Sequence, residues 1–216
     1  MMTGDISVFW DESENTVKCK LPITSPTSKV RVKRKGLEPV ATRQVKLCED
    51  DYIEWQISYG EVKKLSEFGE ILALAYKNGI VKKDDINEVK KEFENTKTFE
   101  ELYKISREET GKDYHKFKVL YEKTPILRYE FDDGHYIDIV LRHKQRAVGY
   151  QAMVYIYIPI DKVEPKNLVG RRANPRERVV WTPKKEHILG LLKAFLIASK
   201  DHRNDMIKII EKITQS

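Results

Sequence analysis

Apolar and polar residues alternate along the first part of the chain, which is the pattern of β-strands with one buried face. The alternation covers residues 17–21, 30–33 and 51–59. In the first two segments the polar positions are mostly cationic, and in the third they are Glu54, Gln56 and Ser58. We therefore expect an antiparallel sheet with one apolar face and one polar, largely basic face.

The middle of the chain follows the helical period, with apolar residues three and four positions apart. Three side chains that can accept hydrogen bonds from a first helical turn predict helix starts: Ser66, Asp84 and Thr98. Glu101 follows Thr98 at the spacing of a capping box, and Asn78 with Gly79 is typical of a helix end. We expect a helical insert of three helices at about residues 65–111.

Strand-like segments return in the second half of the chain, at residues 126–131, 135–141 and 148–158. Asp133 and Gly134 predict a hairpin turn between the first two of them. The basic residues 142–146 connect the last two. The sheet is therefore expected to continue after the helical insert.

Two helices are expected near the end of the chain. Thr182 and Pro183 precede an apolar stripe at residues 188–196, which is typical of an amphipathic helix. Asp201 can cap a last helix. Together the segments predict a single α+β domain over residues 1–216, built on an antiparallel sheet.

The composition is that of a soluble globular protein, with 40% hydrophobic and 34% charged residues among 216. Cys19 and Cys48 are not spaced as CxxC, so we expect neither a disulfide framework nor a structural zinc site. The first residues lack a basic stretch followed by an apolar run, and the longest apolar stretch is too short to span a bilayer. We expect a cytoplasmic protein that does not bind membranes.

Positive charge is concentrated in two segments of the chain, whose total formal charge is +6. Residues 18–46 contain nine Lys or Arg and one acid, and residues 142–178 contain nine and three. Acidic residues gather instead in the helical insert. Two basic segments of this kind favour an acidic partner such as a nucleic acid.

His202 and Asp205 are the first candidate reactive pair. They are three residues apart in the first turns of the expected last helix, so they share a helical face. Backbone N–H groups there favour an ionised carboxylate, which can stabilise a developing cation while the imidazole moves a proton. The alternative is that Asp201 caps the helix and that His202 and Asp205 are both solvated.

Two further pairs can contact a base or a phosphate. Glu54 and Tyr59 lie in one Trp- and Tyr-rich strand, where Glu54 either belongs to the polar face or binds a base. Lys144 and Gln145 lie in the basic hairpin connection, where a lysine can bind phosphate and a glutamine can hydrogen-bond a base edge. A solvated turn explains this second pair equally well.

The order and spacing of these residues resemble the PabI-type restriction DNA glycosylases, the half-pipe family. The matching residues are Glu54, Tyr59, Lys144, Gln145, His202 and Asp205. The resemblance implies a strongly curved antiparallel sheet, or half-pipe, with flanking helices. It also implies a homodimeric restriction enzyme that excises adenine from 5′-GTAC-3′ in double-stranded DNA without a metal cofactor. Abasic sites then break by β-elimination or through a separate endonuclease, and a methyltransferase protects the host's own sites.

The resemblance also assigns roles. Asp205 stabilises the oxocarbenium-like sugar or activates water, His202 assists it, and Tyr59 contacts the flipped adenine and its sugar. A strand regular through Gly60 sends Tyr59 and Glu54 to opposite faces, so we expect the strand to bulge or bend between Gln56 and Gly60.

The remaining roles concern DNA binding. Glu54 helps to bind the base, and Lys144 and Gln145 enter the duplex near the vacated space. The family also uses arginines of its N-terminal strands. Arg31 is our choice over Arg34 and Arg43, because the flanking valines place it on the basic face.

Two other functions remain open. A magnesium-dependent PD-(D/E)xK nuclease would use Asp50 or Asp51 with Glu61 and Lys63, although Glu61 follows a glycine and leaves the strand. A non-catalytic DNA-binding module would need only the two basic segments. The three functions differ in whether adenine is released and in whether cleavage needs magnesium.

Overall fold

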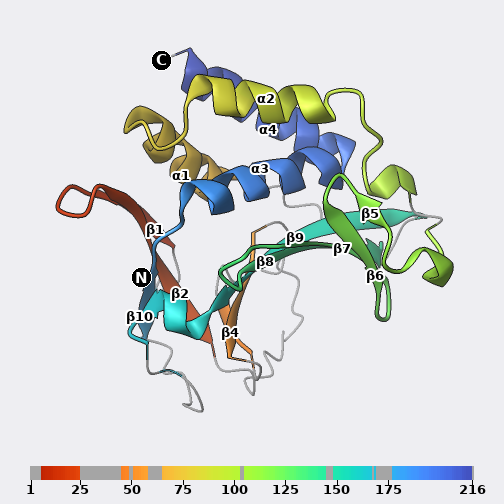
Figure 1. The fold of residues 1–216 in the computed structure, drawn as a ribbon, viewed down its shortest axis with the longest axis horizontal. Coiled ribbons are helices and arrows are strands. Elements are labelled where there is room, and N and C mark those ends of the chain that lie inside the picture. The colour runs from red at the N-terminus through yellow and green to blue at the C-terminus, as the bar shows by residue number, and fades with distance from the viewer. Residues whose placement is uncertain are drawn as a thin grey trace, which may run out of the picture.

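In the part of the chain that the structure describes, four helices lie on one side of a large curved sheet that does not close on itself (Figure 1). The computed structural model describes residues 6–24, 45–48, 51–57, 65–102, 105–144, 148–166, 168 and 177–215. No helix in these segments is long and apolar enough to cross a membrane. The predicted α+β class and the curved sheet implied by the resemblance are confirmed.

As far as the chain is described, the sheet has eleven strands in the spatial order β10-β11-β2-β3-β4-β9-β8-β7-β6-β5, with β1 paired to β2. Their bounds are β1 Ser7–Asp11, β2 Thr16–Thr24, β3 Val45–Leu47, β4 Tyr52–Gln56, β5 Asp113–Tyr114, β6 Phe117–Tyr121, β7 Pro125–Glu130, β8 Tyr136–His143, β9 Tyr150–Pro159, β10 Val163–Glu164 and β11 Arg178–Trp181. The predicted hairpin at Asp133 and Gly134 joins β7 to β8. Gly134 has φ +92°, a backbone conformation that favours glycine in such a turn.

One pair of neighbouring strands departs from the expected antiparallel sheet. β2 and β3 run parallel, with Ile23 opposite Val45 and Thr24 opposite Lys46. The other described pairs are antiparallel. Residues 25–44 connect β2 to β3, and a connection of this length allows the chain to re-enter the sheet in the same direction. The sheet is therefore mixed at this one pair.

The helices are α1 Ser66–Lys77, α2 Lys83–Phe93, α3 Lys185–Ala198 and α4 Lys200–Thr214, and short 3-10 turns lie at Glu100–Leu102, Arg107–Glu109 and Ile160–Lys162. The first two helices of the predicted insert are confirmed, but the third is wrong. The Thr98–Glu101 capping box forms, with the Thr98 N–H donating to Glu101 Oε2 at 2.7 Å. However, the Phe99 N–H donates to Ile197 O and the Gly111 N–H donates to Val119 O. The Phe99 bond ties to α3 an N–H that has no partner within a first helical turn. The Gly111 bond joins the other end of the segment to β6 instead of continuing a helix, and the segment forms two short 3-10 turns.

Several predicted caps lie one or two residues away from the true helix ends. α1 and α2 are capped by Leu65 and Lys82 rather than by Ser66 and Asp84. α4 begins after Ser199, whose side chain accepts from the His202 N–H, so Asp201 is not its cap. Ser199 stands in a fully buried corner between α3 and α4, which favours a small side chain over an ionised one.

The core lies between α3 and the helix-facing side of the sheet (Figure 1). Ile53, Trp55 and Ile57 are buried there, which confirms the parity predicted for β4. Trp55 meets Trp181 of β11 edge to face, with ring centroids 6.1 Å apart. Gly190 lets α3 approach the sheet closely, because a Cβ at this position would lie 2.5 Å from Cζ of Phe131.

Candidate active site

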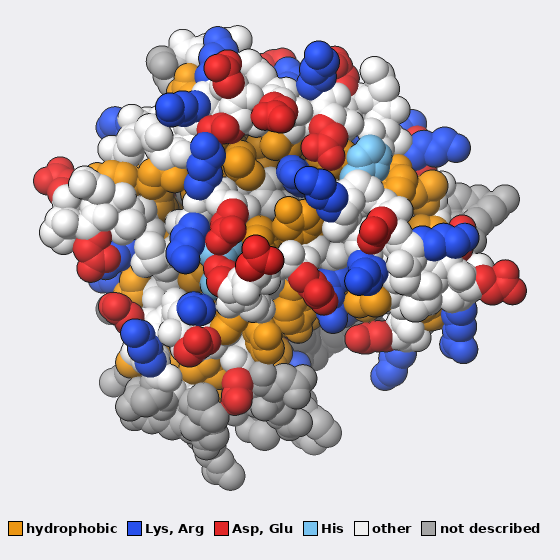
Figure 2. Space-filling view, in the orientation of Figure 1, with side chains coloured by type: hydrophobic (Ala, Val, Ile, Leu, Met, Phe, Trp, Pro, Cys, Tyr) orange, Lys and Arg blue, Asp and Glu red, His pale blue; other side chains and the backbone are white. Residues whose placement is uncertain are grey.

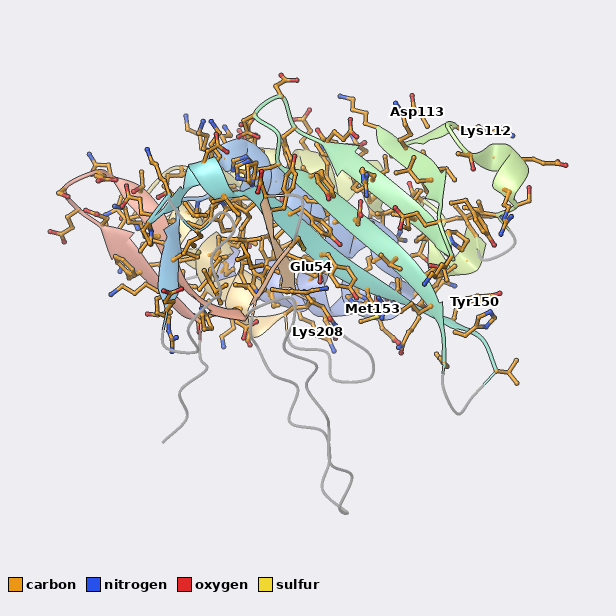
Figure 3. The ribbon with its side chains drawn as sticks, turned by 90° about the horizontal axis from the view of Figure 1, so that it is seen from below. Glu54, Lys112, Asp113, Tyr150, Met153 and Lys208 are labelled. Carbon is orange, nitrogen blue, oxygen red and sulfur yellow. The ribbon has the colours of Figure 1, made fainter. Side chains whose placement is uncertain are left out.

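Glu54 lies on the outer sheet face, which we define as the face directed away from the helices. Figure 3 looks at this face from below and labels Glu54 on β4. Its neighbours across the strands are Lys46 of β3 and Tyr157 of β9. The Tyr157 hydroxyl donates to Glu54 Oε2 at 2.8 Å. The carboxylate predicted to bind a base is therefore fixed by a tyrosine of the neighbouring strand.

A row of aromatic rings continues from Glu54 across the outer sheet face. Tyr157 stacks on Tyr136 of β8, with centroids 4.4 Å apart and an interplanar angle of 12°. The Arg128 guanidinium lies 4.3 Å from the centroid of Tyr136 and makes two hydrogen bonds to the Asp138 carboxylate, at 2.7 and 2.8 Å. This ion pair raises the pKa of Arg128, so the guanidinium stays charged over the ring.

His202 lies at the start of α4 and is 5% exposed, so the alternative that it is solvated is wrong. Its backbone N–H donates to Ser199 Oγ at 3.0 Å, and its Nδ1 also contacts the Ser199 hydroxyl. Its ring lies nearly parallel to Phe195 of α3, with centroids 6.2 Å apart. The orientation of the imidazole is thus determined by the corner between α3 and α4.

Arg203 fixes the same turn from its other side. Its Nε donates to Leu196 O at 2.8 Å and one terminal nitrogen donates to Thr96 O at 2.7 Å. These bonds connect the start of α4 to the last turn of α3 and to the segment after α2. The turn that carries His202 and Asp205 is therefore held by the chain on both sides.

Asp205 is half-buried and lines a groove of about 1420 Å³ between α1 and α4. The start of α1 lines the same groove through Leu65 and Ser66. Five lysines also line it: Lys77, Lys82, Lys83, Lys208 and Lys212. Tyr59 precedes Leu65 by six residues in sequence. The groove at Asp205 is therefore formed by the helix that directly follows the Tyr59 segment.

A second hollow, of about 790 Å³, lies at the very start of α4, one turn before Asp205. Lys200 and Asp201 line it from α4, and His143 and Tyr150 line it from the β8–β9 hairpin. Lys144 is exposed next to His143, and its backbone N–H donates to Gly149 O at 3.1 Å. The fold therefore brings the loop end of the predicted DNA-contacting hairpin to the start of α4.

Several predicted site residues lie outside the described residues: Tyr59, Gln145 and Arg31, as well as Asp50, Glu61 and Lys63 of the nuclease alternative. The expected bulge between Gln56 and Gly60 also lies mostly outside them. Asp51 is described, and it is exposed in the turn before β4 with φ +63°. The alternation of β4 persists as far as Ile57, whose N–H donates to Val154 O at 3.0 Å.

A buried polar cluster that the sequence did not reveal joins the β7–β8 turn to α3. Asp133 Oδ1 lies 2.9 Å from Nδ1 of His135, and its Oδ2 lies 2.8 Å from Nε2 of His187. The Trp181 indole N–H donates to His135 Nε2 at 3.1 Å, and the Lys184 N–H donates to His187 Nδ1 at 3.0 Å. Each imidazole therefore accepts one bond on its far nitrogen and donates the other to Asp133.

This donor pattern decides what the cluster can hold. The ligand-type atoms of Asp133, His135 and His187 lie within 4.8 Å of one another, which is a metal-like grouping. To bind a metal, each histidine would have to give up the proton on the nitrogen that faces Asp133 and carry it on its other nitrogen. That other nitrogen now accepts a hydrogen bond from the N–H of Trp181 or Lys184, so each imidazole N–H would then face another N–H group. Burial lowers the pKa of His135 and, to about 4, that of His187. Both histidines are thus neutral and donate to an ionised Asp133 carboxylate, and the cluster connects the β7–β8 turn to α3.

The comparisons with known proteins place this arrangement in a family. The sequence model of the family "R.Pab1 restriction endonuclease" matches residues 99–213, which is more than half of the chain. The chain belongs to this family. No curated protein sequence matches it. The resemblance drawn from the six spaced residues is therefore confirmed at the level of the family.

Solved structures extend the R.Pab1 match over nearly the whole chain. R.PabI in a complex with nonspecific DNA is 36% identical, with 97% of this chain and 100% of that chain covered and a TM-score of 0.69. A tyrosine-to-phenylalanine, lysine-to-alanine variant of R.PabI with double-stranded GTAC DNA is 39% identical, with 97% and 99% covered and a TM-score of 0.68. The restriction DNA glycosylase R.CcoLI is 27% identical, with 76% and 82% covered and a TM-score of 0.59.

Proposed function

We propose that this member of the R.Pab1 family is a restriction DNA glycosylase that excises adenine from 5′-GTAC-3′ in double-stranded DNA. The observation that supports it best is the turn at the start of α4. Ser199 and Arg203 hold this turn, His202 is oriented within it, and Asp205 opens into the groove beside α1. The R.CcoLI likeness supports glycosylase chemistry, and the R.PabI variant on GTAC DNA supports the target.

The proposed reaction breaks the bond between C1′ of the deoxyribose and N9 of adenine. Adenine leaves with the bonding electrons and takes up a proton, and water supplies the hydroxyl at C1′, so the products are free adenine and an abasic site. Asp205 stabilises the positive charge on the sugar, and His202 orients the water or transfers its proton. Tyr59 contacts the flipped base and its sugar. Each of these steps is carried out by side chains of the protein.

DNA binding is assigned to the outer sheet face and its hairpins. Glu54 binds a base edge, Lys144 and Gln145 enter the duplex beside the displaced bases, and Arg31 contacts the DNA from the N-terminal strands. These four side chains are all polar, and each can donate a hydrogen bond to, or accept one from, a base or a phosphate. The variant of R.PabI that lacks a tyrosine hydroxyl and a lysine supports the choice of Tyr59 and Lys144.

The palindromic target favours a two-fold symmetric dimer in which each protomer contacts one half-site. An adenine methyltransferase specific for GTAC would be needed to protect host DNA, because an unmethylated host site would be a substrate. The methyltransferase is a functional partner and need not bind this chain.

The proposal is tested with a GTAC duplex in excess EDTA, by measuring free adenine and alkali-labile sites. Adenine release is expected from the unaltered protein, and Asp205→Asn should lower its rate at least 100-fold while DNA binding is retained. Asp161→Asn, at an exposed carboxylate on a 3-10 turn, is the matched control and should act like the unaltered protein.

The same assay separates the alternatives. Strand cuts that require magnesium and release no adenine would establish the nuclease, and binding without either product would establish a DNA-binding module. Because His202 is buried, His202→Asn is compared with the unaltered protein by thermal unfolding before its activity is interpreted. An Asp205→Asn variant with full adenine release would refute the role given to Asp205.

A further inference from the structure

Among the described residues, the Glu54 carboxylate is held at one oxygen and open at the other. Tyr157 donates to Oε2 at 2.8 Å, and no described residue donates to Oε1. Glu54 and Tyr157 are directly opposite each other on antiparallel strands, where paired side chains lie close together. Lys46, the neighbour on the other side, is exposed and forms no ion pair with Glu54 among the described residues. Tyr157 therefore determines which way the open oxygen points.

The protonation state of Tyr157 suits this task. Burial raises its pKa first of all, and the nearby Glu54 carboxylate raises it further. The phenol thus keeps its proton and remains a donor throughout the physiological pH range. A phenol that donates to a carboxylate forms a charge-assisted hydrogen bond, which is stronger and more directional than one between neutral groups.

The ring of Tyr157 is itself fixed by its neighbours. It stacks on Tyr136, and the Arg128 guanidinium covers Tyr136 while bonded twice to Asp138. Tyr52 of β4 meets the edge of Tyr136, with centroids 5.2 Å apart. Stacked and edge-to-face contacts of this kind restrict the rings to one orientation. The hydroxyl is therefore presented to Glu54 by a supported row of rings.

We propose that Tyr157 is a positioning residue for sequence recognition, which orients Glu54 so that Oε1 accepts a hydrogen bond from a donor group on a base edge. The proposal rests on the function proposed above for Glu54. Tyr157 acts through Glu54 and does not touch the reacting atoms. Loss of its hydroxyl should lower discrimination for the cognate sequence and leave binding to phosphates unchanged, because phosphate contacts do not depend on Glu54.

The test compares Tyr157→Phe with Tyr155→Phe, Glu54→Ala and the Tyr157→Phe/Glu54→Ala double variant. Tyr155 is the matched control, since it lies on the same strand and face but its hydroxyl donates to Met153 Sδ at 3.9 Å. Fluorescence anisotropy measures the Kd for a GTAC duplex and for a scrambled duplex, and adenine release is followed in parallel. Thermal unfolding reports any loss of folded protein.

We expect Tyr157→Phe to weaken GTAC binding about tenfold, the value of one hydrogen bond to a charged group, and to leave scrambled-duplex binding unchanged. In the Glu54→Ala background the same change should have less than a twofold effect. Tyr155→Phe should bind like the unaltered protein.

A Tyr157→Phe protein with unaltered discrimination would overturn the positioning role, as would equal effects of this change with and without Glu54. Anisotropy decides this point even if no adenine is released. Absence of adenine release from the unaltered protein would instead refute the proposed glycosylase function, so the two failures are distinguishable.

Discussion

Replacing Asp133 by asparagine tests whether the buried cluster fastens α3 to the β7–β8 turn. The Asp133 carboxylate accepts from both His135 and His187, whose tautomers are fixed by Trp181 and Lys184. An amide offers only one oxygen, so its NH2 group would face an imidazole N–H. One hydrogen bond is lost and two donors are directed at each other.

The cost follows from these contacts. A hydrogen bond to a charged group contributes about 1.5–3 kcal/mol, and an unpaired buried donor costs about 1–3 kcal/mol. Because the Asp133 side chain is 15% exposed, water can partly relieve the clash, and the low end of the sum applies. We expect a loss of about 3 kcal/mol in the free energy of unfolding, which lowers Tm by about 6–12 °C in a chain of this size.

Urea unfolding followed by circular dichroism at pH 7 measures the loss, and the slope against urea shows whether unfolding remains two-state. Asp132→Asn is the matched control, since Asp132 is the exposed neighbour and should change stability by less than about 0.5 kcal/mol. Equal stability of the Asp133→Asn and Asp132→Asn proteins would refute the assignment of fixed tautomers.

Four further predictions concern stability and binding. The free energy of unfolding should fall as pH drops from about 6.5 to about 4. In this range His187 takes up a proton in the unfolded chain, whereas burial lowers its pKa to about 4 in the folded protein and keeps it neutral. A urea midpoint that does not change over this range would contradict the prediction. Gly190→Ala should cost about 1 kcal/mol of unfolding free energy in urea melts, because crowding against Phe131 outweighs the gain in helix propensity; a stabilised variant would show that the ring moves away freely. Arg203→Ala should destabilise by about 2 kcal/mol, since two part-buried carbonyls, Leu196 O and Thr96 O, lose their donor; a change below about 0.5 kcal/mol in the same assay would exclude the bracing role. DNA binding measured by anisotropy should weaken steeply between 50 and 200 mM salt, as expected for counterion release, and a flat response would argue against phosphate contacts.

The local features of the fold were predictable from the sequence. Alternation gave the buried face of β4, Asp133 with Gly134 gave the β7–β8 hairpin, and Asn78 with Gly79 gave the end of α1. Each of these depends on residues close together in the chain. Composition contributed less, and Figure 2 shows why: acidic and basic side chains are interspersed over the visible face, so the net charge does not locate a partner there.

Features that depend on distant residues were missed. The parallel β2–β3 pair is set by how the chain returns to the sheet, and alternation looks the same in either direction. Asp133 meets His187 across 54 residues, so its turn chemistry was visible and its second role was not. Tyr157, which holds Glu54 from 103 residues away, belongs to the same class. The pairing of β4 with β9 would have been needed to find the Tyr157 contact, and the packing of α3 on the sheet to find the His187 contact.

Ser199 is both the C-cap of α3 and the N-cap of α4, so this single residue is all that separates the two helices. Because the connection is a single residue, an insertion or a change of backbone conformation there would shift α4 and the side chains that it carries. Efforts to retarget such a protein to another sequence should therefore leave this corner untouched and vary the strands and hairpins of the opposite layer, which can change side chains without changing the path of the backbone.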